Sequence, residues 1–196
     1  MTGGNPHSAH HLGEAGAGNG PGWVFWITGL AGAGKTTIAR SFFSIWVQRY
    51  PLSLLLDGED LRRVVMPEAG FSLADRLECA RRYGLLCKLL SEQGLNVVIA
   101  TISMFEQCRR WNRTNLPHYF EVYLRAPIET LVERDQKGLY SGQSGATLVV
   151  GKDLPCEYPS NSDLTIDNDG VRTPEEIAEF LLQEALTGIR QTRGEQ

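Results

Sequence analysis

Short apolar runs alternate with stretches of helical periodicity from residue 23 onward. The apolar runs predict five strands, at residues 23–27, 52–56, 96–102, 120–124 and 164–166. Helices are predicted near residues 36–48, 72–93, 104–115, 128–135 and 174–186. Because helical crossovers join parallel strands with a right-handed sense, this order predicts an α/β fold whose five-stranded parallel sheet has helices on both faces.

The periodic part of the chain predicts one folded domain at residues 23–188. A chain of 196 residues with 42% hydrophobic residues is long enough for one substantial core. Residues 1–22 are rich in Gly, Ala, Asn and His and predict a disordered tail, and residues 189–196 predict a short C-terminal tail. The histidines of the first tail lack the packed surroundings that a metal site needs.

A phosphate-binding loop is the strongest chemical signal in the sequence. Residues 29–36, Gly-Leu-Ala-Gly-Ala-Gly-Lys-Thr, fit Gly-x-x-x-x-Gly-Lys-Ser/Thr and lie between the first predicted strand and helix. The glycines let main-chain N–H groups surround a polyphosphate at a helix N-terminus. Lys35 is expected at the β- and γ-phosphates, and Thr36 on Mg²⁺. The predicted ATP-binding residues are Gly29, Leu30, Ala31, Gly32, Ala33, Gly34, Lys35, Thr36 and Thr37, with Arg134 farther along.

Asp57 follows the second predicted strand, and Gly58 lets the chain turn there. Ligands bind beyond the carboxyl ends of parallel strands, so this carboxylate is expected beside the phosphate-binding loop. It would orient Mg²⁺ through water or accept the proton of an attacking hydroxyl. The sequence leaves both roles open.

Three further residues lie where an acceptor substrate would bind. Arg62 would contact a phosphate or sulfate, unless it is simply solvated. Phe71 would stack on a nucleobase or pack as a hydrophobic staple on the helix that Ser72 and Asp75 cap. Ser103 either caps the next helix or contacts the acceptor.

Two groups of residues are interpreted as structural rather than functional. Leucines at helical spacing predict buried positions, namely Leu77, Leu85, Leu86, Leu89 and Leu90. Arg109, Arg110 and Arg113 predict a solvated helix face.

Residues 136–160 contain several glycines and no clear element. A loop of this length in a compact domain is typical of a mobile lid that closes over substrates. Arg134 and Lys137, where this loop begins, would neutralise charge on a transferred phosphoryl group. Lid, loop and sheet together predict a P-loop nucleoside-triphosphate kinase fold.

Net charge and cysteine content indicate which classes of binding partner and which cellular compartment to expect. The net charge of −4 and the pI near 5.6 argue against nucleic-acid binding. Four cysteines without metal-like spacing predict reduced thiols. No stretch has the length of a membrane span or the apolar core of a signal peptide, so a cytoplasmic protein without membrane contact is expected.

Six motifs occur in the order seen in adenylyl-sulfate kinases. They are Gly-Leu-Ala-Gly-Ala-Gly-Lys-Thr-Thr, Leu-Asp-Gly-Glu-Asp-Leu-Arg, Gly-Phe-Ser-x-x-Asp-Arg, Arg-Arg-x-Gly, Ile-Ser and Arg-Asp-Gln-Lys-Gly-Leu-Tyr. The chain resembles this family over residues 23 to about 188. The resemblance implies ATP- and Mg²⁺-dependent phosphorylation of the 3′-hydroxyl of adenosine 5′-phosphosulfate. A homodimer is a further possibility that the sequence leaves open.

The resemblance also implies roles for individual residues. Lys35, Asp57 and Ser103 take the catalytic positions, and Ser103 corresponds to the family's phosphoserine, although in-line transfer needs no covalent intermediate. The implied acceptor contacts are Asp57, Arg62, Phe71, Arg76, Cys79, Ile102, Ser103, Lys137 and Leu139.

The chain departs from the family pattern around the acceptor. Glu59 and Cys79 replace an aspartate and an asparagine of the family, and residues 141–151 of the lid contain no basic residue. Val149-Val150-Gly stands where the family's Phe-Thr-Gly closes an aromatic ring over the adenine. One missing stacked ring removes roughly 1–3 kcal/mol of base binding. The same segments resemble a divergent branch that contains cytidine diphosphoramidate kinases, which is the alternative function.

A nucleotide-binding regulator without phosphotransfer is a second alternative, from a different class. A guanine-specific switch would need Asn-Lys-x-Asp after a strand, and residues 167–170, Asp-Asn-Asp-Gly, do not supply it.

Overall fold

A computed structural model describes residues 20–135, 138–141 and 148–194 of the chain. Most of the predicted N-terminal tail and part of the predicted lid, including Lys137, lie outside the described residues. No described helix is at once long and apolar enough to cross a bilayer.

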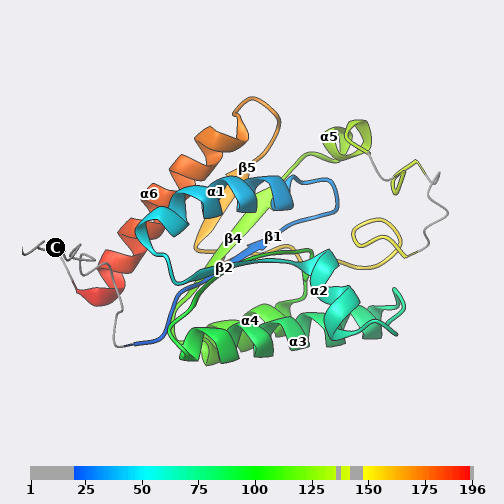
Figure 1. The fold of residues 1–196 in the computed structure, drawn as a ribbon. Coiled ribbons are helices and arrows are strands. Elements are labelled where there is room, and N and C mark those ends of the chain that lie inside the picture. Colours follow the sequence, from blue (N-terminus) through cyan, green and yellow to red (C-terminus); the bar gives the residue numbers. More distant parts are fainter. Residues whose placement is uncertain (1–19, 136–137, 142–147, 195–196) are drawn as a thin grey trace, which may run out of the picture.

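The described residues form a five-stranded parallel sheet with the strand order β2-β3-β1-β4-β5, which confirms the predicted sheet (Figure 1). The strands are β1 (Val24–Thr28), β2 (Ser53–Asp57), β3 (Asn96–Thr101), β4 (Tyr119–Arg125) and β5 (Leu164–Asp167). Every residue of β1 is buried, because this central strand has neighbours on both edges and helices on both faces. The continuous apolar run that predicted β1 follows from this position.

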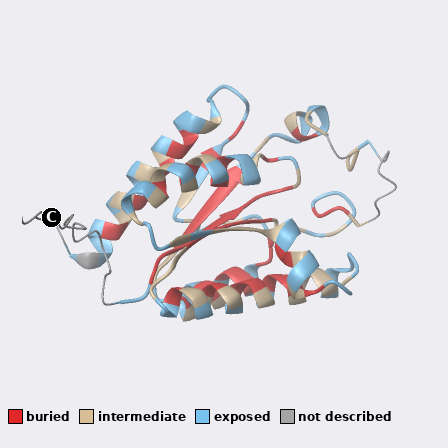
Figure 2. Ribbon diagram, in the orientation of Figure 1, coloured by how far each residue is buried: buried red, intermediate tan, exposed pale blue. Residues whose placement is uncertain are grey.

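In the described part of the chain, six helices connect or follow the strands: α1 (Lys35–Arg49), α2 (Gly58–Val65), α3 (Leu73–Glu92), α4 (Glu106–Asn115), α5 (Ile128–Glu133) and α6 (Pro174–Arg193). Helices α1 and α6 cover one face of the sheet, and α3 and α4 cover the other (Figure 1). Successive β1 side chains therefore enter different cores. Phe25 and Ile27 pack with α1 and α6, whereas Val24 and Trp26 pack with α2 and α3. Figure 2 shows the resulting pattern, with buried strands between helices whose outer faces are exposed.

Two helices differ from the predictions, one in its length and one in that it was not predicted. Helix α6 continues to Arg193, and Ile189 is buried against the core, so the folded part extends beyond the predicted boundary at residue 188. Helix α2 was not among the predicted helices, because it starts directly at the end of β2 and is short. The predicted cap of α3 is confirmed: Ser72 and Asp75 form a complete capping box.

The predicted leucine core of α3 is only partly right. Leu86 and Leu90 pack against the sheet, but Leu85 and Leu89 are exposed. The positions that face the sheet are Cys79, Tyr83 and Cys87, spaced by four residues. Leucines around the helix were taken for one stripe, whereas smaller and aromatic residues form the buried one.

Candidate active site

The phosphate-binding loop leaves the carboxyl end of β1, the central strand, and ends where α1 begins. Gly34 is the N-cap of α1 and has a φ of 85°, a left-handed conformation that favours glycine. A Cβ at this position would lie 2.5 Å from Nδ2 of Asn168. Glycine is therefore required both by the backbone and by the neighbouring side chain.

Lys35 lies against the loop, since its Nζ donates a hydrogen bond of 2.7 Å to the carbonyl of Leu30. Thr36 and Thr37 are exposed in the first turn of α1, where their N–H groups precede the regular helical bonding pattern. The predicted loop residues thus surround a helix N-terminus that is open to an anion.

Asp57 reaches the loop from the end of the edge strand β2. Oγ1 of Thr36 donates to Oδ2 of Asp57 at 2.6 Å, and Oδ1 of Asp57 accepts from the N–H of Glu59 at 2.8 Å. The same carboxylate therefore caps α2 and contacts the predicted Mg²⁺ ligand. A cavity of about 200 Å³ lies beside the pair.

The donor chemistry of this pair fits Mg²⁺. A hydroxyl and a carboxylate are hard oxygen donors, and Mg²⁺ is usually bound through one or two protein groups together with substrate phosphates. Within the described ranges no cluster of three or more His, Cys, Asp or Glu side chains could form a metal cage. Thr36 and Asp57 would hold the ion, which would neutralise charge on the polyphosphate.

On the side of the site away from α1, two arginines contact one aromatic ring. The guanidinium of Arg62 lies 4.4 Å from the ring centre of Phe71, and that of Arg76 lies 5.5 Å from it. Phe71 is 57% exposed, so it does not pack on α3 as a hydrophobic staple. Stacking on a nucleobase stays a prediction.

Arg62 and Arg76 bind main-chain carbonyls, whereas other arginines of α2 and α3 pair with carboxylates. Arg62 donates to the carbonyl of Ala69, and Arg76 donates to the carbonyls of Phe71 and Leu148. Within the described residues neither has a carboxylate within ion-pair distance. Burial and the nearby charge of Arg62 lower the pKa of Arg76. An anion placed between the two guanidinium groups would offset both effects.

The other predicted acceptor contacts are less exposed. The Cys79 thiol is buried against the sulfur of Met66, at 3.6 Å. Ser103 is buried, has a φ of 23°, and shares a 2.7 Å hydrogen bond with the hydroxyl of Thr101. The carbonyl of Ile102 accepts from Thr28, and the N–H of Leu139 donates to Asp135.

Ser103 does not cap the following helix, so that alternative is wrong. The N-cap of α4 is Phe105, which offers no side-chain acceptor. The N–H of Glu106 donates instead to the carboxylate of Glu157. A side chain 51 residues away performs the capping, and no local pattern predicts such a contact.

The described ends of the lid segment are packed on the phosphate-binding loop. Val150 lies in one apolar cluster with Leu30 and Ala33, and the Tyr140 hydroxyl donates to the carbonyl of Ala31 at 2.9 Å. Asp135 accepts from three consecutive N–H groups, those of residues 139–141. The base of the lid and the donor site are therefore in direct contact.

Asn168, directly after β5, supports the loop and was missed at the sequence level. Its buried Nδ2 donates to the carbonyl of Ala33 at 2.9 Å, and its own carbonyl accepts from Arg134 at 3.2 Å. The signal was present: a polar residue follows a buried strand at the carboxyl edge of the sheet, the same rule that identified Asp57.

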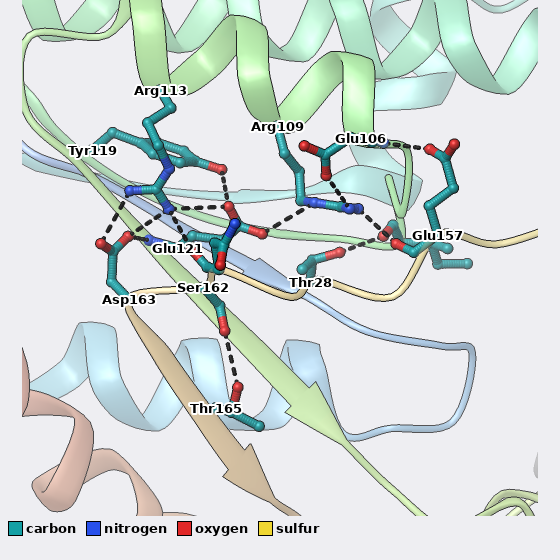
Figure 3. Close-up of polar contacts among 12 residues, drawn as sticks. Thr28, Glu106, Arg109, Arg113, Tyr119, Glu121, Glu157, Ser162, Asp163 and Thr165 are labelled. Atoms are coloured by element: carbon teal, nitrogen blue, oxygen red, sulfur yellow. Dashed lines mark hydrogen bonds and ion pairs between the residues drawn. The ribbon is translucent and has the colours of Figure 1, made fainter.

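The arginines of α4 also differ from the prediction. Arg109 is buried and pairs with Glu106 and Glu121, and Arg113 pairs with Glu121 and Asp163 (Figure 3). Arg110 and Arg113 are exposed, although Arg113 is paired. The predicted solvated face is wrong for Arg109, which is buried against Glu121 of β4, whereas Arg113 is exposed and reaches its acidic partners from the surface.

Fold and loop together define a P-loop kinase. The same fold occurs in shikimate kinase from Acinetobacter baumannii, at 13% identity and a TM-score of 0.59, over 87% of this chain and 95% of that one. A structure of the Mycobacterium tuberculosis APS kinase in complex with AMPPNP and APS is more similar, at 30% identity and a TM-score of 0.76. The match covers 84% of this chain and 98% of that one.

Sequence comparison identifies the family. The adenylylsulphate kinase family model matches residues 21–167. An adenylyl-sulfate kinase of Marinobacter nauticus is 39% identical over 148 residues, 74% of each chain. A cytidine diphosphoramidate kinase of Campylobacter jejuni is 34% identical over 163 residues, 82% of this chain and 95% of that one. This chain belongs to the adenylyl-sulfate kinase family and is an ATP-dependent phosphotransferase, which disfavours a non-catalytic regulator.

Proposed function

We propose that the protein transfers the γ-phosphoryl group of ATP to the 3′-hydroxyl of adenosine 5′-phosphosulfate. The observation that carries this proposal is the arrangement along α2: Asp57, bonded to Thr36 at the donor side, caps this helix, and Arg62 of the same helix lies over Phe71. Arg62 and Arg76 present two positive charges that have no carboxylate partner in the described part of the chain. An acidic protein with net charge −4 that leaves these charges uncompensated is suited to a small anionic acceptor.

The proposed reaction is an in-line displacement. The acceptor hydroxyl oxygen forms a bond to the γ-phosphorus while the bond from that phosphorus to the β–γ bridging oxygen breaks, and ADP leaves. Lys35 stabilises the charge on the transferred group from the donor side. The hydroxyl proton goes to Asp57 or to solvent.

The contact with Thr36 favours a role for Asp57 on the Mg²⁺ side rather than as the base. One carboxylate oxygen is 2.6 Å from the Thr36 hydroxyl, and the other is occupied by the N–H of Glu59. Asp57→Asn is expected to lower kcat and to raise the Mg²⁺ concentration required for half-maximal rate. Loss of the acid limb of the pH–rate profile with unchanged Mg²⁺ dependence would instead assign Asp57 as the base.

A cytidine nucleotide is the second candidate acceptor, and one observation favours it. Val149 and Val150 are both buried in the base of the lid, so this segment presents no aromatic ring for a purine. Stacking on Phe71 alone suits a smaller base. The relative from Campylobacter jejuni, named a cytidine diphosphoramidate kinase, covers more of this chain than the Marinobacter nauticus relative does.

A panel of acceptors tests both candidates. The purified protein is given Mg²⁺-ATP with adenosine 5′-phosphosulfate, cytidine diphosphoramidate, AMP or CMP, and ADP release is measured. We expect the kcat/KM for adenosine 5′-phosphosulfate to exceed the values for AMP and CMP by at least tenfold. A higher kcat/KM for cytidine diphosphoramidate would establish the second candidate, and no transfer to any nucleotide would refute both.

A further inference from the structure

We infer that Arg109 and Glu157 are positioning residues for the acceptor. They join the β3–α4 connection, which carries Ser103, to the C-terminal part of the predicted lid segment, around Glu157. This inference rests on the proposed function, because it takes the acceptor to bind beside Ser103. Neither residue was predicted as a site residue, and neither touches the phosphate-binding loop in the contacts described above.

Glu157 contacts the start of α4 at three points. Its N–H donates to the carbonyl of Met104 at 3.0 Å, and its carboxylate accepts from the N–H of Glu106. Its carbonyl accepts from Nη1 of Arg109 at 2.8 Å. Figure 3 shows Glu157 and Arg109 facing each other beside α4. The C-terminal part of the predicted lid segment is thereby held against the residues that follow Ser103.

Arg109 is the centre of this arrangement. Its side chain is 4% exposed and reaches Oε2 of Glu106 at 2.7 Å and Oε1 of Glu121 at 3.3 Å. Glu121 is equally buried, and burial raises the pKa of its carboxyl group. Burying an ion pair costs desolvation energy, and apolar residues of similar size often serve stability as well. A precise placement of the β3–α4 connection is a use for the pair that apolar residues would not supply.

The β3–α4 connection needs such support because its backbone is unusual. Ser103 has a φ of 23°, a region that non-glycine residues rarely occupy without constraint from their surroundings. Thr28 holds the preceding carbonyl, that of Ile102, from the end of β1. Glu157 and Arg109 hold the following residues from the opposite side. Ser103 is therefore fixed between two independent anchors.

Residues 148–156, which precede Glu157 in the same lid segment, also contact residues of the β3–α4 connection and of the proposed acceptor site. Cys156, Leu154 and Val150 pack in one cluster with Met104, and the carbonyl of Leu148 accepts from Arg76. A shift of Glu157 would therefore move both Ser103 and the carbonyl partner of Arg76. This cluster reaches the phosphate-binding loop through apolar packing on Leu30 and Ala33, whereas the hydrogen bonds described for Arg109 and Glu157 reach the β3–α4 connection, so we expect a smaller effect on the donor side.

A matched pair of substitutions on α4 tests the inference. Arg109→Lys and Arg113→Lys make the same change on the same helix, and both arginines pair with Glu121, but only Arg109 contacts Glu157. Lysine lacks the planar fork that serves several acceptors at once. Arg109→Lys is expected to raise the acceptor KM about tenfold, the loss of one charge-assisted hydrogen bond, with ATP KM changed less than twofold. Arg113→Lys should leave both KM values within twofold.

Glu157 provides the conservative comparison. Glu157→Gln keeps an oxygen that can accept from the N–H of Glu106, whereas Glu157→Ala removes it. The glutamine variant should retain most of the acceptor affinity, and the alanine variant should show the same selective KM increase as Arg109→Lys. If the ATP and acceptor KM values rise together, or if Arg113→Lys has the same effect, the inference is wrong.

Hydrogen–deuterium exchange of the ligand-free protein separates this inference from the proposed function. Arg109→Lys is expected to speed exchange in the peptides that cover residues 102–106 and 154–158, and Arg113→Lys is not. Unchanged exchange in the Arg109 variant would overturn the positioning role. Failure of the wild type to phosphorylate any nucleotide would refute the proposed function, while the exchange experiment would still decide whether this pair positions the connection.

Discussion

The phosphate-binding side of the site and the proposed acceptor side around Phe71 are built in different ways. On the donor side the main chain between β1 and α1 is surrounded by buried groups, including Asn168 below Ala33 and Leu30 in an apolar cluster. On the acceptor side Phe71 is exposed, and the two arginines beside it have only backbone carbonyls and the ring as partners among the described residues. The donor side is held by buried contacts, whereas the proposed acceptor side is exposed and leaves two positive charges for a ligand to compensate.

This difference suits a family whose members are named for different substrates. The relatives named above include both an adenylyl-sulfate kinase and a cytidine diphosphoramidate kinase. An exposed ring and uncompensated cations can be adapted to another base or anion without disturbing the core. Substitutions on the two sides are therefore expected to affect different kinetic parameters.

The largest effect is expected at Lys35. Lys35→Ala removes a preorganised cation from the donor side, and kcat should fall by about 100- to 1,000-fold. Lys88→Ala, which removes a half-buried lysine that pairs with Glu92 on α3, is the control and should leave kcat unchanged. Steady-state rates and melting temperatures are measured for both. Wild-type turnover in Lys35→Ala would contradict the assignment of the donor site.

On the acceptor side, Arg62→Ala and Arg76→Ala should each lower acceptor kcat/KM by about 10- to 100-fold, the value of a charge-assisted hydrogen bond. The KM for ATP should stay within twofold of the wild-type value. Arg81→Ala removes an arginine of α3 that already pairs with Glu78, and it should change neither parameter. Equal losses for Arg81→Ala and Arg76→Ala would contradict the proposal that the arginines without a carboxylate partner bind the acceptor.

A pair of glycine substitutions tests the rigidity of the donor side. Gly34→Ala and Gly94→Ala introduce the same left-handed strain, at φ values of 85° and 83°. Each should cost about 1–3 kcal/mol of unfolding free energy in urea titrations. Only Gly34→Ala should also raise the KM for ATP, because the new methyl group meets Asn168. If Asn168→Ala does not reduce this additional effect, the side-chain contact is not its cause.

The smallest effect concerns the paired arginines of α3. Hydrogen bonds from Arg81 and then Arg82 lower the pKa of Glu78 from 4.5 to about 2. Because the folded-state pKa is the lower one, the stabilisation is present above pH 4.5 and is lost as the pH falls toward 2. Glu78→Gln should lose a small amount of stability at pH 7 and none at pH 2. A difference from wild type that does not depend on pH would contradict the charge pairing.

Local sequence patterns were sufficient to predict the sheet, the phosphate-binding loop and the cap of α3. Each of these depends on residues that are neighbours along the chain, such as the apolar run of β1 or Ser72 with Asp75. Asp57 and Thr36 could also be predicted, because strand ends in a parallel sheet meet at one edge. These features follow from hydrogen bonding and periodicity within short segments.

Contacts between distant segments were decided only by the tertiary structure. Asn168 lies under a loop 135 residues away, and Glu157 caps α4 across 51 residues. The buried pairing of Arg109 and the exposure of Leu85 depend on which face of a helix meets the sheet. Composition and spacing describe a helix but not the neighbour that it packs against. For that physical reason the chemistry of this protein could be inferred from its chain, whereas the anchors that hold the site in place could not.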